Sequence, residues 1–148
     1  MFNSPTISNN NISFNRGKWG GGIEIYHGSP TIEKNIIKFN EVLEVGGGIS
    51  MSYSSPIIIG NTIEYNETDG NGGGIRIFDS NPVIIDNSIM KNHAGGQGGG
   101  IYISGFSSPI IGGASTVDTG DFNIICGNAP DQVYPDDYSN NYLSDDCE

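Results

Sequence analysis

Isoleucines and small polar residues recur with one fixed period along most of this chain. The motif Gly-Gly-Gly-Ile occurs four times at steps of 26 residues, and an apolar-x-apolar pair starts at the isoleucine of each copy. The four copies span residues 20–23, 46–49, 72–75 and 98–101. The alternation predicts a short strand with one buried face in each copy. A fixed period of this size is typical of a solenoid, in which one structural unit stacks on the next.

A second pattern keeps the same period. It has the form Pro-x-Ile-x-x-Asn-x-Ile-x-x-Asn, and its copies begin at prolines 5, 30, 56, 82 and 109. The fifth copy is interrupted after Ile111 by about nine extra residues. The paired isoleucines predict one or two further strands per unit, with strands of successive coils lying parallel at roughly 4.8 Å. We therefore expect an all-β solenoid of about five coils, with repeats over residues 1–112 and an irregular last coil and acidic C-terminal cap over residues 113–148.

Asparagine fills two columns of this repeat. The first column holds Asn10, Asn35, Asn61, Asn87 and Asn123, and the second holds Asn15, Asn40, Asn66, Asn92 and Asn128. Asparagine tolerates a left-handed backbone at turns, and stacked amides can form a hydrogen-bonded ladder. Glycine triplets allow unusual backbone conformations or close approach of neighbouring chains. We interpret all these columns as architectural.

Together, Gly-Gly-Gly-Ile-x-Ile and Ser-Pro-x-Ile-x-x-Asn-x-Ile-x-x-Asn resemble the repeats of right-handed parallel β-helix proteins of the pectate-lyase-like superfamily. The resemblance covers residues 1 to about 112 and implies right-handed coiling. It does not imply one activity, because the superfamily includes lyases, hydrolases, epimerases and adhesins. The C-terminal segment more loosely resembles those of secreted bacterial β-helix proteins.

Composition narrows the possible partners. The formal net charge is −11 with only six Lys and Arg residues, which argues against binding to nucleic acid or anionic membranes. No apolar run is long enough to insert into a membrane. Cys126 and Cys147 are the two cysteines, and we expect them to form a disulfide that ties the tail to the final coil. We accordingly predict an extracellular or cell-surface protein.

The start of the chain suggests self-association. Met1 lies almost directly before the first repeat, so we expect a mature or trimmed form, or part of a larger secreted precursor. Few residues are then left to cover the first coil, and an uncovered coil can template another coil. End-to-end stacking through Pro5, Ile7, Asn10 and Ile12 would produce filaments; a truncated chain with a frayed first coil is the alternative.

Catalytic chemistry has few candidates. Aligning the coils places Glu24, Ser50, Arg76 and Tyr102 in one outward column, with Glu24 and Arg76 two coils apart. That separation, about 9.6 Å, is too great for a direct pair. Asp79 lies close to Arg76 in the sequence, and we expect the two to form a solvated charge pair. A polysaccharide lyase or hydrolase would have to use Glu24, Arg76 and Asp79, and we consider a non-catalytic role better supported.

Two sets of residues are candidates for binding. Carboxylates at the turn after the second asparagine could bind calcium between coils, because calcium prefers oxygen ligands, although charged loops are more often only solvated. They are Glu41, Glu44, Glu67 and Asp69. Aromatic residues on or beside the outward side of the glycine-motif strand could bind the flat faces of sugars, or could pack against neighbouring loops. They are Tyr26, Tyr53, Phe78, Tyr102 and Phe106. The leading prediction is a structural or adhesive extracellular solenoid with no cofactor, and the alternative is a carbohydrate-binding module.

Overall fold

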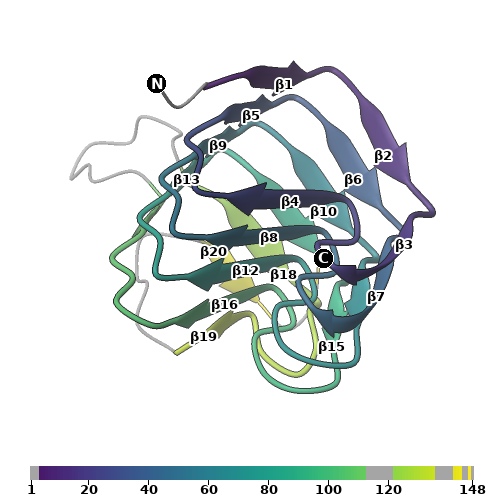
Figure 1. Ribbon diagram of the computed structural model, residues 1–148. Helices are drawn as coiled ribbons and strands as arrows, with labels where there is room; N and C mark the ends of the chain where they lie inside the picture. The colour runs from purple at the N-terminus through teal and green to yellow at the C-terminus, as the bar shows by residue number, and fades with distance from the viewer. Residues whose placement is uncertain (1–3, 113–121, 136–141, 145–146, 148) are drawn as a thin grey trace.

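The chain winds into a parallel β-solenoid whose coils stack along one axis, from β1 at the top of Figure 1 to β19 at the bottom. The computed structural model describes residues 4–112, 122–135, 142–144 and residue 147. These residues form short strands and turns and contain no helix. Corresponding strands of successive coils pair in parallel and build four sheets, which we name A to D in chain order. The predicted all-β solenoid with a period of 26 residues is confirmed.

The strands of each sheet come from one part of the repeat. Sheet A contains β1 (Thr6–Ser8), β5 (Thr31–Glu33), β9 (Ile57–Ile59), β13 (Val83–Ile85) and β17 (Ile110–Ile111). Sheet B contains β2 (Asn11–Ser13), β6 (Ile36–Lys38), β10 (Thr62–Glu64), β14 (Ser88–Met90), β18 (Ile124–Cys126) and β20 (Tyr142–Ser144). Sheet C contains β3 (Arg16–Trp19), β7 (Glu41–Val45), β11 (Glu67–Thr68) and β15 (His93–Ala94). Sheet D contains β4 (Ile23–Tyr26), β8 (Ile49–Ser52), β12 (Ile75–Phe78), β16 (Ile101–Ser104) and β19 (Val133–Tyr134).

The core is a set of isoleucine columns that run parallel to the solenoid axis. In sheet A, Ile32, Ile58 and Ile84 pair in register and are fully buried. Sheets B and D contribute equivalent columns, with Met51 replacing one isoleucine in sheet D. Every sheet thus turns one face inward, and stacking removes the inward-facing apolar side chains of the middle coils from water.

Sheet C was not predicted. We expected a turn after the second asparagine, but the backbone there is extended and pairs with the coils on either side. Its inward residues are Gly17, Val42, Thr68 and Ala94, which share small size but not apolar character. The residue pattern therefore gave no strand signal, and pairing with neighbouring coils decides the conformation.

The predicted asparagine ladders are formed on both columns. Asn66, in the middle of the second column, is an example. Its side-chain oxygen accepts hydrogen bonds from the backbone N–H and side-chain amide of Asn40, at 3.2 and 2.9 Å. The Asn66 amide donates to the carbonyl of Ile37 and to the side-chain oxygen of Asn92. The first column continues across residues 113–121, because Asn87 donates to Asn123. The described part of the chain contains no buried side-chain nitrogen or oxygen without a hydrogen-bond partner.

One detail of the asparagine prediction is wrong. In the first four coils the left-handed residue at these turns is the one before the ladder asparagine, as at Phe39 (φ 54°) and Tyr65 (φ 53°). None of the ladder asparagines in the described chain has a positive φ. The asparagines are instead held by their amide hydrogen bonds, and the residue before them adopts the left-handed conformation that the turn requires.

The C-terminal residues close the last coil. The side-chain oxygen of Gln132 accepts hydrogen bonds from the backbone N–H and side-chain amide of Asn128, as a further ladder asparagine would. Val133 is buried at the end of the sheet D column, and β19 pairs with β16. Cys126 on β18 is bonded to Cys147, with their Cα atoms 5.3 Å apart, as predicted. The extra residues of the fifth repeat lie outside the described residues, as does much of the predicted 113–148 cap.

Candidate functional site

The outward face of sheet D carries the aligned residues that the sequence predicted. Glu24 pairs in register with Ser50, Ser50 with Arg76, and Arg76 with Tyr102. The Arg76 guanidinium lies along the protein surface, where it donates to the Ser52 hydroxyl at 3.0 Å and sits 5.0 Å from the ring centroid of Phe78. Partial burial lowers the pKa of Arg76, against the opposing effects of Tyr102 and Glu24. Arg76 remains a cation, but its guanidinium already contacts the Ser52 hydroxyl and the Phe78 ring.

Aromatic rings gather where the first three strands of sheet D end. Tyr53 makes edge-to-face contacts with Tyr26 and with Phe78, with ring centroids 5.9 and 5.7 Å apart. His27 stacks on Tyr53 at 5.1 Å and meets Tyr26 edge-on at 4.3 Å. We call these four residues the aromatic edge. Tyr26 and Tyr53 are 66% and 47% exposed, so the cluster faces solvent rather than packing beneath a loop.

The aromatic edge takes its shape from the turn into sheet A. His27 and Tyr53 occupy the left-handed turn position, with φ of 52° and 53°, whereas Tyr26 and Phe78 are the last residues of their strands. Rings from the strand-end column (Tyr26 and Phe78) and from the turn column (His27 and Tyr53) therefore lie next to one another in successive coils. Below them, Ser54 forms part of a ladder of serine hydroxyls, accepting from the backbone N–H of Gly28.

An open hollow lies beside these rings. Its volume is about 180 Å³, and its lining combines the two stacked rings with small polar residues. The lining residues are His27, Gly28, Ser29, Tyr53, Ser54 and Ser55. Flat rings beside hydroxyl groups suit a ligand that has both apolar faces and hydrogen-bonding groups.

A family model of the right-handed β-helix region matches residues 2–144. The chain belongs to this family. A search of curated proteins and a search of solved structures each found no significant match. The family membership establishes the β-helix fold that the repeats predicted, and it leaves the function to be argued from the surface of this β-helix.

Two of the five predicted aromatic residues lie apart from the aromatic edge. Tyr102 stacks on Tyr134 of the closing strand β19, with ring centroids 5.7 Å apart. Phe106 is 96% exposed and makes no ring contact within the described chain. The structure thus brings together Tyr26, Tyr53 and Phe78 and adds His27, which the sequence analysis did not include.

The candidate catalytic residues do not assemble. The Asp79 carboxylate accepts a hydrogen bond from the backbone N–H of Phe106 at 2.7 Å, so it holds the turn of the next coil. The expected Asp79–Arg76 charge pair is not formed: the ion pairs of the described chain are Arg16–Glu41 and Lys18–Glu44. Glu24 remains as an exposed carboxylate two coils away from Arg76.

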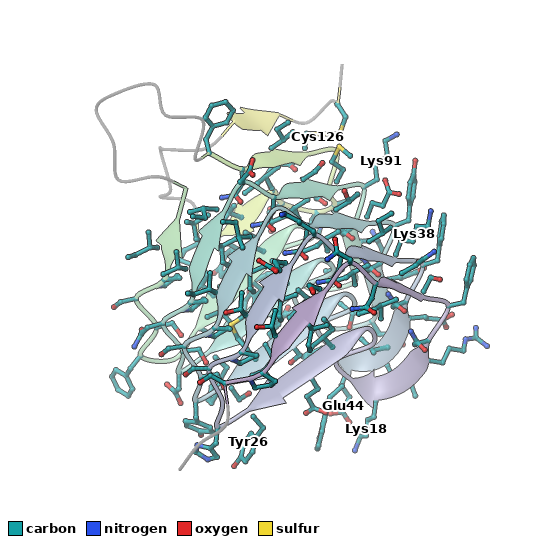
Figure 2. The ribbon with its side chains drawn as sticks, turned by 90° about the horizontal axis from the view of Figure 1, so that it is seen from above. Lys18, Tyr26, Lys38, Glu44, Lys91 and Cys126 are labelled. Atoms are coloured by element: carbon teal, nitrogen blue, oxygen red, sulfur yellow. A yellow bond between two sulfur atoms is a disulfide. The ribbon has the colours of Figure 1, made fainter. Side chains whose placement is uncertain are left out.

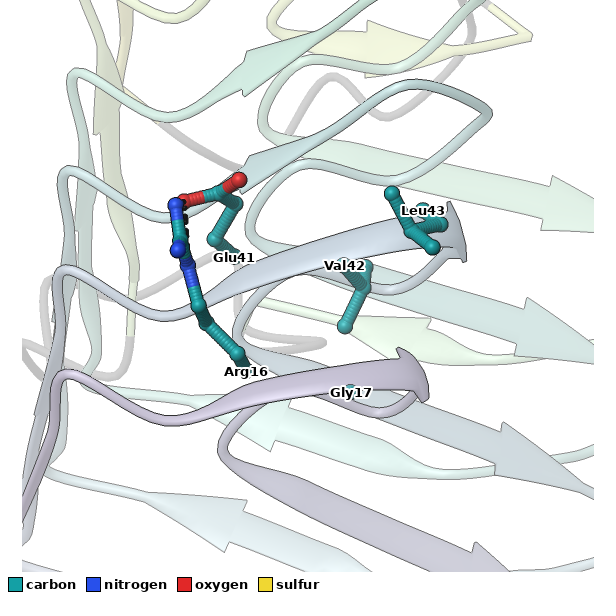
Figure 3. A pocket seen from close by; sticks show the side chains of 5 residues that line it. All are labelled: Arg16, Gly17, Glu41, Val42 and Leu43. Atoms are coloured by element: carbon teal, nitrogen blue, oxygen red, sulfur yellow. Dashed lines mark hydrogen bonds and ion pairs between the residues drawn. The ribbon is translucent and has the colours of Figure 1, made fainter.

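The candidate calcium ligands lie on and beside sheet C. Glu41 is bound by Arg16 at 2.6 Å, beside a hollow of about 370 Å³ that Figure 3 shows between β3 and β7. Glu44 accepts a hydrogen bond from Trp19 and pairs with Lys18 at 3.0 Å. Glu67 lies in register with Glu41. No group of three or more His, Cys, Asp or Glu residues within the described parts of the chain is arranged to hold a metal ion.

A second row of aromatic residues was missed by the sequence analysis. Phe14, Phe39 and Tyr65 stack face to face at 5.2 Å steps on the turn between sheets B and C. Lys91 continues the row; it donates to the Tyr65 hydroxyl at 3.1 Å, and this bond raises the pKa of Lys91. Figure 2 places Lys91 and Lys38 on a different side of the β-helix from Tyr26. The faces of these rings cover one another, so this row stabilises the turns more than it offers a binding surface.

The first coil is the less covered end of the described β-helix. Ile7 and Ile12 are only partly buried, whereas their counterparts in the next coils are fully buried. Pro5 and Asn10, the other predicted contact residues, are exposed.

No helix of the described chain is long and apolar enough to cross a membrane.

Proposed function

We propose that this β-helix is a non-catalytic, adhesive protein that binds carbohydrate through the aromatic edge. The observation that carries the proposal is the cluster of the exposed Tyr26, His27 and Tyr53 with the half-buried Phe78, whose rings contact one another across three coils. An exposed aromatic cluster of this kind is costly to leave in water and is typical of interaction sites.

Carbohydrate fits the chemistry of this surface. The ring faces can contact the apolar C–H faces of sugars, and the exposed Ser29 and Ser55 of the adjoining hollow can hydrogen-bond to sugar hydroxyls. The rings also support one another by edge-to-face contacts, so little side-chain freedom is left to lose on binding. The site is therefore rigid before the ligand arrives.

The way in which the candidate charged residues are used supports a non-catalytic role. A hydrolase of the common type needs two carboxylic groups flanking one bond. Asp79 instead holds a backbone turn, and Arg76 lies against Phe78 and Ser52. The disulfide between Cys126 and Cys147 supports an oxidising, extracellular location.

Affinity electrophoresis in gels containing soluble polysaccharides tests this function. We expect retardation by at least one neutral or acidic polysaccharide, and we expect Tyr26→Ala and Tyr53→Ala to abolish it. Phe106→Ala is the matched control, because Phe106 is an aromatic residue that is even more exposed but lies outside the aromatic edge. Thermal unfolding midpoints near that of the wild type would show that the variants remain folded. Retardation unchanged in Tyr26→Ala and Tyr53→Ala would exclude this surface.

We further propose that copies can associate end to end through the first coil, which the partial exposure of Ile7 and Ile12 favours. At the other end Gln132 already accepts the amide hydrogens of Asn128, so contact would rely on the isoleucines rather than on a continued ladder. Light scattering over a concentration series should show particles that grow with concentration, and negative-stain microscopy should show rods. Ile7→Asp should return them to monomers, and circular dichroism should show that the variant remains folded although its unfolding midpoint falls, because Ile7 also packs against the core. A wild-type protein that stays monomeric at every concentration would exclude stacking.

A further inference from the structure

We infer that the ligand of the aromatic edge is a neutral, extended β-1,4-linked hexose chain that lies parallel to the axis of the β-helix. This inference rests on the proposed function and specifies its ligand. It is carried by the spacing of the rings and by the charge that surrounds them.

The spacing comes from the register of sheet D. Tyr26, Ser52 and Phe78 occupy equivalent positions on β4, β8 and β12. Two strand spacings therefore separate the backbones of Tyr26 and Phe78, about 9.6 Å in all. Between them lies the small Ser52, whose hydroxyl accepts a hydrogen bond from Arg76, and Tyr53 of the neighbouring column contacts both rings edge-on. The surface thus repeats an aromatic side chain at every second coil.

An extended β-1,4-linked hexose chain has a matching repeat. Consecutive sugars are turned by about half a turn, so the same sugar face recurs at every second sugar, and this disaccharide repeat is close in length to two strand spacings. Sugars one and three of a bound chain can then lie against Tyr26 and Phe78. An α-1,4-linked chain curls into a helix and does not keep this spacing.

Charge favours a neutral chain over an acidic one. The protein carries a formal charge of −11, and Glu24 lies on the outward face of the strand that ends in Tyr26. The nearby cation, Arg76, is held by Ser52 and the ring of Phe78. A polyuronate brings one negative charge per sugar into this negative field and is repelled. Sugar hydroxyls can find partners in the exposed Ser29 and Ser55 of the adjoining hollow.

Isothermal titration with β-1,4-glucan oligosaccharides of two to six units tests the inference on the intact protein. We expect the affinity to rise by about three- to tenfold when the chain first spans both rings, between two and four sugars, and to change little thereafter. Phe78→Ala should remove this step, so that the tetrasaccharide binds this variant no more tightly than the disaccharide does. Phe106→Ala should keep the step. Tyr26→Phe, which retains the ring, should also keep it and serves as a conservative variant.

Two comparison ligands separate this inference from the proposed function. Oligomers of α-1,4-glucose and of galacturonate, at equal chain length, should bind more weakly than the β-1,4-glucan series. If either binds equally well or better through Tyr26 and Tyr53, the aromatic edge is a carbohydrate site but the inferred ligand is wrong. If no oligosaccharide or polysaccharide depends on Tyr26 and Tyr53, both proposals fail.

Discussion

Each ladder asparagine of the middle coils binds to the coils on both sides of its own. Asn66 is almost fully buried and satisfies the backbone N–H and amide of Asn40, the carbonyl of Ile37 and the side-chain oxygen of Asn92. No other side chain of this size offers a donor and an acceptor in the same plane with this reach. A substitution therefore affects three coils at once.

We expect Asn66→Ala to lower the free energy of unfolding by more than about 3 kcal/mol, because it leaves several buried polar groups without partners. Asn10→Ala is the control at the exposed end: it should cost less than about 1 kcal/mol, since the backbone N–H of Asn10 still binds Asn35. Urea unfolding followed by circular dichroism measures both. Equal losses for the two variants would show that the ladder does not act through buried hydrogen bonds.

The single tryptophan reports on one carboxylate. The pKa of Glu44 is lowered, first by its hydrogen bond from Trp19 and then by Lys18. A carboxylate with a lowered folded pKa stabilises the fold above its unfolded pKa, and the contribution is lost as the pH falls through the folded value. Trp19 fluorescence should thus titrate with a midpoint below the ordinary glutamate value of 4.5. Glu44→Gln should abolish the transition, and Lys18→Ala should move it upward; a midpoint at or above the ordinary value would contradict the contact.

At the scale of the strand and its turn, the glycine triplet serves two purposes. The first glycine of each copy has a positive φ, for example 77° at Gly72. The third passes close to the next coil: a Cβ on Gly74 would lie 2.6 Å from the carbonyl oxygen of Gly100. Glycine is needed there because neighbouring backbones, rather than flexible side chains, fill the space.

Gly74→Ala should destabilise the protein by about 1 to 3 kcal/mol, because two backbones would have to separate inside a packed coil. Gly17→Ala provides the matched control, since a Cβ at Gly17 would meet its nearest neighbour at 3.4 Å and the backbone there has a negative φ. We expect the control to unfold within about 0.5 kcal/mol of the wild type. Chemical denaturation resolves the difference, and a similar stability for both variants would exclude close backbone approach as the reason for the triplet.

The aromatic edge is also a property of the strand ends. Tyr26 and Phe78 end strands of sheet D, while His27 and Tyr53 take the turn position that follows. The rings meet only because sheet D keeps its register across three coils. Any insertion that shifted one coil by a residue would separate the cluster and turn core isoleucines outward.

At the scale of the whole molecule, the stability of a solenoid depends on its ends. The closing residues act through Gln132, which ends an asparagine ladder, and through β20, which pairs with β18. The Cys126–Cys147 disulfide joins β18 to the end of the described chain, 21 residues further on. The cross-link thus limits how far the closing strand can leave the last coil.

Reduction of this disulfide should lower the free energy of unfolding by about 2 to 4 kcal/mol. Amide hydrogen exchange should increase first in β20 and β18, and the middle coils should keep their protection because each contacts only its neighbours. The double variant Cys126→Ser and Cys147→Ser is the control and should not respond to a reductant. Uniformly faster exchange along the β-helix would instead mean that the closing segment stabilises every coil.

The repeat by itself determined the solenoid, its period, the isoleucine core and the asparagine ladders. It could do so because identical residues at a fixed spacing must fall on the same face of stacked coils. It did not predict sheet C, because Gly17, Val42, Thr68 and Ala94 share no apolar pattern and only pairing between coils makes them a strand.

The candidate binding surface could be predicted only in part from the sequence. Alignment of the coils selected five outward aromatic residues, but it could not show that Tyr102 stacks on Tyr134 or that His27 joins Tyr53. It also could not show that the Asp79 carboxylate accepts a hydrogen bond from the backbone N–H of Phe106. Side-chain direction at a left-handed turn and contacts with non-repeating segments depend on the packed structure, and these decided which rings form one surface.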